Sequence, residues 1–285
     1  MTGRTASTGR TALAGRTLLM SGGSRGIGLA IALRAARDGA NVALLAKTDQ
    51  PHPRLPGTVH TAAEAIEEAG GKALAIVGDV RRDEDVQRAV RATVERFGGI
   101  DVVVNNASAI ALQNPGELPV RRHDLMMEVN VRGTFLMTSL VLPHMRASDH
   151  AQVLTLSPPL NPDARWLRDH APYTVSKYGM TMLTLGVAEQ HRAGGRLSAN
   201  CLWPRTTIAT AATANMRGAD ESLRVSRTPQ IMADAAHAVL VRPAGHTTGQ
   251  CLIDEDVLRG EGVSDFAGYR ADPAATEPLR TDIFL

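Results

Sequence analysis

Cysteine and aromatic residues are scarce in this sequence. Of 285 residues, two are cysteines and 3% are aromatic. Cys201 and Cys251 both lie in apolar runs, which excludes a disulfide framework and predicts two buried thiols in a reducing, cytoplasmic setting. Two thiols alone do not make a zinc site, so we expect no metal centre.

An excess of one charge and a long uninterrupted apolar run are also missing. The 31 Lys and Arg residues against 29 Asp and Glu leave a formal net charge of +2. This balance gives no excess of positive charge that would favour binding to nucleic acid. It also gives no excess of acidic residues of the kind that is typical of disordered chains. Arg, Asp, Gly or Pro interrupt the longest apolar runs, which argues against a membrane span of about 20 residues. We expect a soluble protein that binds no nucleic acid.

The hydrophobic pattern predicts a single α/β domain. Hydrophobic residues make up 44% of the chain, and short runs rich in Val, Ile and Leu alternate with longer Ala-rich stretches of helical period. The predicted strands are 17–21, 41–46, 73–78, 101–105, 152–157, 198–203 and 250–253. The predicted helices are 26–38, 61–69, 83–97, 122–145, 172–191 and 230–241. Right-handed crossovers then give a Rossmann-type, doubly wound, seven-stranded parallel sheet with helices on both faces.

Irregular stretches mark the ends and the loops of this domain. Residues 1–16 contain three arginines and no acid. We interpret them as a flexible tail because glycines interrupt any amphipathic helix, with a mitochondrial transit peptide as the alternative. The domain is expected over 17–254, with a polar lid near 205–228 and a C-terminal extension over 255–285 that packs on it.

A glycine-rich turn joins the first predicted strand to the first helix. Gly22, Gly26 and Gly28 are spaced four and two residues apart. Backbone N–H groups at a helix N-terminus bind anions, and residues without a Cβ let a pyrophosphate approach closely. On the first strand–helix unit of a doubly wound sheet, the turn predicts dinucleotide binding. The predicted contacts are Gly22, Ser24, Arg25, Gly26, Ile27 and Gly28.

The end of the second predicted strand favours NADP(H) over NAD(H). An NAD site usually places Asp or Glu there for the ribose hydroxyls, whereas a 2′-phosphate needs cations. The strand leads into Lys47, and Arg25 lies in the glycine turn that faces the same ribose. Asp49 follows closely, so an alternative in which its carboxylate serves the ribose stays open.

Tyr173 and Lys177 lie four residues apart on a predicted helix, so the phenol and the ammonium share one face. A nearby ammonium stabilises phenolate and lowers the pKa of a tyrosine. The phenol can then exchange a proton with a carbonyl or alcohol oxygen. Taken alone, such a pair is common on solvated surfaces.

Together these motifs resemble the short-chain dehydrogenase/reductase family, from about residue 17 to residue 253. The resemblance implies cofactor contacts at Asp79, Val80, Asn106, Ala107, Ser108, Tyr173, Lys177, Pro204, Thr206 and Thr207. The backbone near Thr207 would hold the nicotinamide carboxamide. The run Ser157-Pro158-Pro159 is similar to the hydroxysteroid dehydrogenase-like branch, whose larger members carry a sterol-carrier domain. We expect the reductase domain alone in 285 residues.

The resemblance also implies catalytic roles. Tyr173 is the acid/base, Lys177 lowers its pKa and holds the nicotinamide ribose, Ser157 orients the substrate oxygen, and Asn130 holds a proton-relay water. Two departures bear on this mechanism. Pro158 stands where the family has its catalytic serine, which leaves Ser157 one position early. Arg205 replaces a glycine beside the nicotinamide edge.

We therefore predict an NADP(H)-dependent oxidoreductase that interconverts a carbonyl and a secondary alcohol of a small molecule. Because the family pairs its fourth and fifth helices across a dimer, we expect a homodimer or homotetramer through 122–145 and 172–191. The departures at Pro158 and Arg205 support an alternative: a cofactor-binding module with weak or no catalysis, acting as a redox sensor or an assembly subunit.

Overall fold

A computed structural model describes residues 12–51, 57–217 and 219–285, in which seven strands form one parallel sheet. The strands are β1 (Thr17–Ser21), β2 (Asn41–Ala46), β3 (Lys72–Val77), β4 (Val102–Asn105), β5 (Ala151–Thr155), β6 (Leu197–Trp203) and β7 (Cys251–Ile253). Their order is β3-β2-β1-β4-β5-β6-β7, so the direction of winding reverses between β1 and β4. Doubly wound sheets bind ligands at the carboxyl ends of the strands at this point. The predicted fold class is confirmed.

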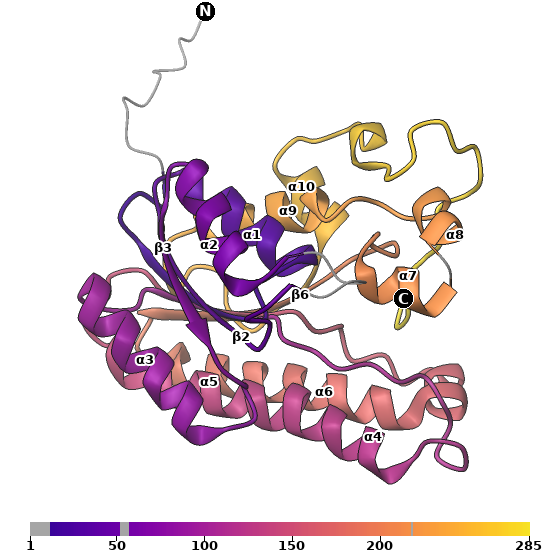
Figure 1. Cartoon of the computed structure of the whole chain (residues 1–285), viewed down its shortest axis with the longest axis horizontal. Helices are drawn as coiled ribbons and strands as arrows, with labels where there is room; N and C mark the ends of the chain where they lie inside the picture. The colour runs from indigo at the N-terminus through magenta and orange to yellow at the C-terminus, as the bar shows by residue number, and fades with distance from the viewer. Residues whose placement is uncertain (1–11, 52–56, 218) are drawn as a thin grey trace, which may run out of the picture.

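Helices cover both faces of the sheet. The helices are α1 (Gly26–Ala36), α2 (Val59–Glu68), α3 (Asp83–Phe97), α4 (Val120–Met126), α5 (Gly133–Val141), α6 (Ala164–Arg192), α7 (Ala211–Arg217), α8 (Ala219–Arg224), α9 (Gln230–Leu240) and α10 (Asp254–Gly260). A π-helical turn, η1 (Met127–Arg132), joins α4 to α5, and 3₁₀ turns occur at η2 (Leu142–Met145) and η3 (Ala267–Tyr269). Figure 1 shows α1, α2 and α9 on one side of the sheet and α3, α5 and α6 on the other.

The strands can be predicted from the sequence because helices cover the centre of the sheet on both faces. Every residue of β1, β5 and β6 is buried. Such strands appear as continuous apolar runs rather than as an alternation. The observed bounds agree with the predicted ones within two residues. Cys201 and Cys251 are register partners on β6 and β7, and both thiols are free. Cys251 is only partly buried, so the prediction of two buried thiols holds for Cys201 alone.

The two longest predicted helices differ in detail from the observed ones. The helix predicted over 122–145 is a succession of α4, η1, α5 and η2. The helix predicted from Pro172 begins eight residues earlier, at Ala164, and is irregular at His170, where φ is −140°. A proline inside a helix removes one hydrogen bond and crowds the preceding turn, and the irregularity two residues before Pro172 accommodates this.

The stretch predicted as a lid contains the short helices α7 and α8, which the sequence analysis did not predict, and α10 follows β7 directly. Six or seven residues are too few to display a helical period. Of the predicted tail, residues 1–11 lie outside the described residues, so the transit-peptide alternative stays open. Leu13, within the predicted tail, is fully buried in the core beneath α1 and α9.

Among the described residues, one helical run passes a test for membrane spans by length and composition. This run is Val120–Met145, with a mean hydropathy of 1.2. Half of its most apolar window is buried inside the fold, as in the core helix of a globular domain.

Candidate active site

Three glycines allow β1, α1 and the loop after β4 to pack tightly. The backbone of Gly22 has a φ of +75°, in the left-handed region. A Cβ on Gly28 would lie 2.5 Å from Nδ2 of Asn106 and 2.9 Å from the carbonyl oxygen of Gly22. Asn106 donates a hydrogen bond of 2.8 Å from Nδ2 to that carbonyl. Larger residues do not fit here, and α1 begins beside this turn without a side-chain cap on its N–H groups.

A cavity of about 350 Å³ opens beside the glycine turn. Nine predicted cofactor residues line it: Gly22, Ser24, Arg25, Lys47, Asp79, Val80, Asn106, Ala107 and Ser108. Gly26 and Gly28 are not in its lining. They shape the turn instead, and Gly26 has a φ of +59°.

Two cations lie at the end of β2 in this cavity. Arg25 donates from Nη2 to the carbonyl of Gly57 over 2.8 Å and to Oγ1 of Thr48 over 3.3 Å, which fixes its guanidinium there. Lys47 lies next along the rim, and 62% of its side chain is exposed. The basic character predicted for this part of the site is therefore present in the lining.

The nearby carboxylates are paired, and one of them, Asp79, lies 3.9 Å from Nζ of Lys47. Asp49 is absent from the lining, and its carboxylate is hydrogen-bonded to Nε2 of His60 over 2.7 Å. The alternative in which Asp49 serves the ribose if the loop folds back stays a prediction. Asp79 accepts hydrogen bonds from Nη2 and Nε of Arg81 at 2.8 and 3.0 Å. Burial alone would raise the pKa of Asp79, but the bonds from Arg81 hold it below its ordinary value.

A second cavity of about 200 Å³ meets the first at Asn106 and Ser108. Five further predicted residues line it: Ile27, Tyr173, Lys177, Pro204 and Thr207. Ile110, Leu112, Leu156 and Trp203 make most of the remaining wall apolar. The predicted nucleotide site and the Tyr173/Lys177 pair therefore belong to adjoining cavities at one edge of the sheet.

Burial dominates the electrostatics of this pair. Tyr173 and Lys177 are 4% and 2% exposed. Burial raises the pKa of the Tyr173 phenol, assisted by the Asp282 carboxylate and opposed by a hydrogen bond with Ser108. Burial lowers the pKa of Lys177 to about 7. Its Nζ donates to the carbonyl of Leu156 over 2.7 Å. Burial is therefore the largest influence on the phenol pKa in this arrangement, and the predicted effect of the ammonium stays a prediction.

The C-terminal segment Thr281–Leu285 closes the second cavity. Asp282 and Ile283 line it, and Nε1 of Trp203 donates to the carbonyl of Ile283 over 3.0 Å. Phe284 is fully buried, and its ring lies 6.0 Å from the Tyr173 ring in a stacked arrangement. The rings of Trp166, Tyr178 and Trp203 surround it at centroid distances of 5.6, 5.3 and 5.9 Å. The sequence analysis missed this contribution.

Ser157 and Asn130 lie outside the lining of both cavities. Oγ of Ser157 is fully buried, 2.9 Å from Oγ1 of Thr181. The Asn130 side chain accepts from the backbone N–H of Ala109 over 2.7 Å and donates to the Ala109 carbonyl over 2.9 Å. It also donates to Oγ of Ser176 over 3.0 Å. The Asn130 side chain therefore holds the loop after β4, and its predicted role with a relay water stays a prediction.

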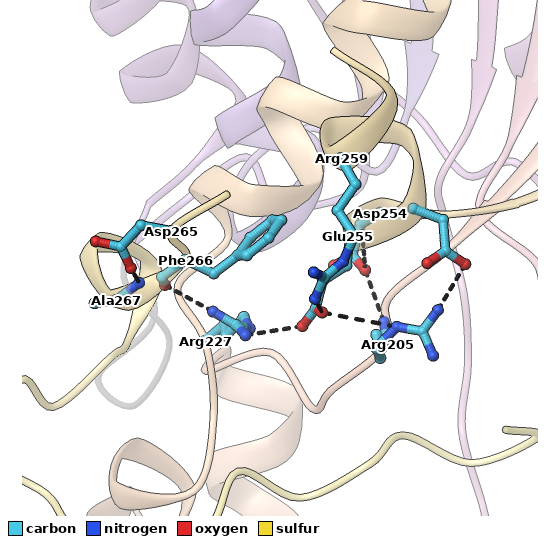
Figure 2. Close-up of polar contacts among 9 residues, drawn as sticks. Arg205, Arg227, Asp254, Glu255, Arg259, Asp265, Phe266 and Ala267 are labelled. Atoms are coloured by element: carbon cyan, nitrogen blue, oxygen red, sulfur yellow. Dashed lines mark hydrogen bonds and ion pairs between the residues drawn. The ribbon is translucent and has the colours of Figure 1, made fainter. Parts of the chain in front are cut away.

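The Arg205 side chain lies among acidic residues (Figure 2). Its Nη2 lies 2.6 Å from Asp256, and its backbone N–H donates to Asp254 over 2.8 Å. The buried Glu255 accepts from Arg227 over 2.8 Å and from Arg259 over 2.9 Å. Arg205 stands where the family has a glycine. Its side chain does not crowd the second cavity, because Arg205 is absent from the lining of that cavity.

The segment after β6 is tied to the C-terminal residues by its backbone. The Thr207 N–H donates to the carbonyl of Arg280 over 2.9 Å, and its carbonyl accepts from Arg227 over 3.0 Å. Thr206 forms an isolated antiparallel bridge with Thr281 and does not line either cavity. The Thr207 N–H is thus paired within the chain, and its carbonyl keeps a second lone pair; the expected carboxamide contact at the backbone near Thr207 stays a prediction.

The fold and the paired cavities define a class of protein. The family described as "short chain dehydrogenase" matches residues 16–221, and the chain belongs to this family of oxidoreductases. Among curated relatives, hydroxysteroid dehydrogenase-like protein 2 of Danio rerio is 50% identical over 94% of this chain, and that of Homo sapiens is 47% identical. These matches confirm the predicted resemblance. The chain spans 63% of the length of these relatives.

Solved structures agree with this assignment. A protein from Xanthomonas campestris superposes with a TM-score of 0.91 at 49% identity, covering 96% of this chain and 98% of the other. A short chain dehydrogenase from Mycobacterium thermoresistibile gives 0.89 at 52% identity, covering 96% of both chains. An NADH-dependent reductase complexed with NAD gives 0.68 at 27% identity, covering 85% of this chain and 96% of the other.

The family binds a nicotinamide cofactor, and the residues present here fit one. The glycine turn leaves room where a Cβ would clash with Asn106, and the uncapped start of α1 adjoins the first cavity. Asn106 and Ser108 line both cavities, so the cations at the end of β2 and Tyr173 belong to adjoining spaces.

Proposed function

We propose that this chain is an NADP(H)-dependent oxidoreductase that interconverts a carbonyl and a secondary alcohol, with Tyr173 as the acid/base. The observation that carries the proposal is the position of Tyr173 and Lys177 in a cavity that adjoins the nucleotide cavity. When bound, the cofactor supplies or accepts the hydride.

The preference for NADP(H) rests on Arg25 and Lys47. Both line the first cavity at the end of β2, where the 2′ position of the adenosine ribose would lie. Asp49, which follows β2, is bonded to His60, and Asp79 in the same lining is bonded to Arg81 and lies 3.9 Å from Nζ of Lys47. Two cations suit a dianionic phosphate better than a pair of ribose hydroxyls.

The proton chemistry follows from burial. A phenol whose pKa is raised keeps its proton at neutral pH, so Tyr173 is ready to donate it to the oxygen of a carbonyl undergoing reduction. The charged form of Lys177 stabilises the phenolate left behind. Because burial lowers the pKa of Lys177 to about 7, this assistance fades as the pH rises above neutrality unless a bound anion restores the charge.

The second cavity favours a small, uncharged and mostly apolar carbonyl compound. Its wall is largely aliphatic and aromatic, and the Asp282 carboxylate repels an anion beside the reacting carbon. A family name that refers to steroids does not by itself assign one as substrate.

We also propose a homo-oligomer that uses the groove between α5 and α6. The groove has a volume of about 700 Å³ and contains the exposed side chains of Phe135 and Met182, 53% and 63% exposed. Gly186 lies in the same groove, and a Cβ there would meet nothing within 4 Å. In the proposed two-fold dimer, we expect the protruding side chains of one copy to pack into the open positions of the other.

An assay of NADPH and NADH oxidation over ketones, β-keto acyl compounds and steroids tests the proposed function. We expect turnover with NADPH, and a loss of about 10²–10⁴-fold in kcat for Tyr173→Phe. Tyr178→Phe is the matched control, since its hydroxyl bonds to the backbone of Asn161. Full activity of Tyr173→Phe would refute the mechanism. Absence of turnover, with NADPH still raising Tm, would favour the cofactor-binding module.

A further inference from the structure

The position expected to orient the substrate oxygen carries no usable hydroxyl. Oγ of Ser157 is fully buried beside Thr181, and the Cys201 thiol is hydrogen-bonded to it from β6. Pro158 follows without a hydroxyl, and its carbonyl accepts from Oγ1 of Thr181 over 2.7 Å. Neither residue lines the cavity that contains Tyr173. The end of β5 therefore turns its hydroxyl into the core.

A different serine lies beside the phenol. Ser108 is exposed and lines both cavities, at the point where they meet. Ser108 and Tyr173 line the second cavity together, and the Ser108 side chain is near enough to the phenol to lower its pKa. It follows β4, which pairs with β5, so the two loops approach the cavity from neighbouring strands. The sequence analysis assigned Ser108 to the cofactor alone.

We propose that Ser108 is the catalytic serine of this chain, and that its hydroxyl holds the substrate oxygen against the phenol of Tyr173. This inference rests on the proposed oxidoreductase function. During reduction, hydride adds to the carbonyl carbon, the electron pair of the broken π bond moves to oxygen, and that oxygen takes the Tyr173 proton. Ser108 donates a hydrogen bond to the oxygen throughout and keeps its own proton, so its role is to fix geometry and stabilise developing charge.

The loop that carries Ser108 is held on both sides. The backbone N–H of Ala107 donates to Oγ of Ser21 over 3.2 Å. The N–H and the carbonyl of Ala109 are both bonded to the Asn130 side chain, at 2.7 and 2.9 Å. Such fixing of the backbone pre-organises the hydroxyl between its neighbours. Asn130 is thereby a positioning residue that acts through the loop.

The test compares Ser108→Ala with Ser157→Ala at saturating NADPH on a carbonyl substrate found in the assay above. For Ser108→Ala we expect kcat to fall about 10²–10³-fold, as for loss of one oxyanion donor, with the Kd for NADPH within about twofold of wild type. Ser108→Thr, which keeps a hydroxyl, restores part of the rate. For Ser157→Ala we expect kcat within about twofold, even where Tm falls. In reduction the phenol must be protonated, so the alkaline limb that Tyr173 sets in the pH profile of kcat shifts upward in Ser108→Ala, because the phenol loses a hydrogen bond that lowers its pKa.

The outcomes separate this inference from the proposed function. Loss of activity in Ser157→Ala with retention in Ser108→Ala would overturn the inference. So would a weakened Kd for NADPH with unchanged kcat in Ser108→Ala, since the serine would then serve the cofactor alone. If Tyr173→Phe is inactive and Ser108→Ala keeps its activity, the inference about Ser108 is refuted and the proposed function stands. Active Tyr173→Phe, or a wild type without turnover, refutes the proposed function and the inference with it.

Discussion

Buried acids near the active site differ in how well their charges are compensated. Glu255 is buried, but Arg227 and Arg259 donate to its carboxylate. Asp254 is also fully buried, and it accepts only from the backbone N–H groups of Arg205 and Glu255 (Figure 2). Its Oδ2 has no hydrogen-bond partner in the described part of the chain. Burial therefore raises the pKa of Asp254 from 3.8 to about 6.

Asp254→Asn should stabilise the fold at neutral and alkaline pH. Because the folded-state pKa lies above the unfolded value, the stabilisation from the protonated carboxyl is complete below pH 4 and is lost as the pH rises through about 6. A shift of roughly two units corresponds to about 3 kcal/mol. We expect the free energy of unfolding, measured with urea, to fall less between pH 5 and pH 8 in Asp254→Asn than in wild type.

Asp256→Asn is the matched control for that experiment. Asp256 adjoins Asp254 in the sequence, but its side chain is 57% exposed and pairs with the Arg205 guanidinium. Its replacement should leave the difference between pH 5 and pH 8 unchanged. An Asp254→Asn variant with the same pH dependence as wild type would show that the Asp254 carboxyl does not carry this linkage.

At the scale of elements, local patterns predicted the strands and turns, whereas contacts between distant segments escaped prediction. The buried strands and the glycine turn depend on short-range composition and steric fit, which the sequence displays directly. Placing Ser157 required the orientation of a side chain at a strand end, where a shift of one residue reverses the face. The ring contact between Phe284 and Tyr173 joins residues 111 positions apart in the sequence, so no local sequence pattern predicts it.

Phe284→Ala should detach the C-terminal segment from the active site. Burial of a phenylalanine side chain contributes about 1.5–3 kcal/mol, and the ring of Phe284 also packs against four aromatic neighbours. Both tryptophans of the chain, Trp166 and Trp203, contact this ring. We expect a red shift of the intrinsic fluorescence and a raised KM for apolar carbonyl compounds.

Phe266→Ala provides a matched loss of a buried phenylalanine away from both tryptophans. Phe266 packs in the core beside α9 and α10, against Tyr269. The Phe266→Ala substitution should lower Tm and leave the wavelength of the tryptophan emission maximum unchanged. An unchanged emission and KM in Phe284→Ala would show that the segment stays docked without its ring, and that Asp282 and Ile283 suffice to close the cavity.

At the scale of the whole molecule, the candidate active site is formed by segments that lie far apart in the sequence. The glycine turn, the loop after β4, the first half of α6 and the C-terminal segment all meet at the carboxyl edge of the sheet. The groove between α5 and α6 is a separate surface, since it shares no lining residue with either active-site cavity. The proposed association through this groove would therefore leave both cavities open to cofactor and substrate and would contact the helix that carries Tyr173.

Met182→Glu should convert the oligomer to a monomer. In a two-fold interface the substitution places two carboxylates in a buried apolar contact, and each unpaired buried charge costs several kcal/mol. Light scattering after size exclusion should show wild type at twice or four times the mass of Met182→Glu. Val77→Glu, at an exposed apolar position at the end of the edge strand β3, is the control and should keep the wild-type mass. A monomeric wild type, or a Met182→Glu variant of unchanged mass, would show that the α5/α6 groove does not hold a second copy.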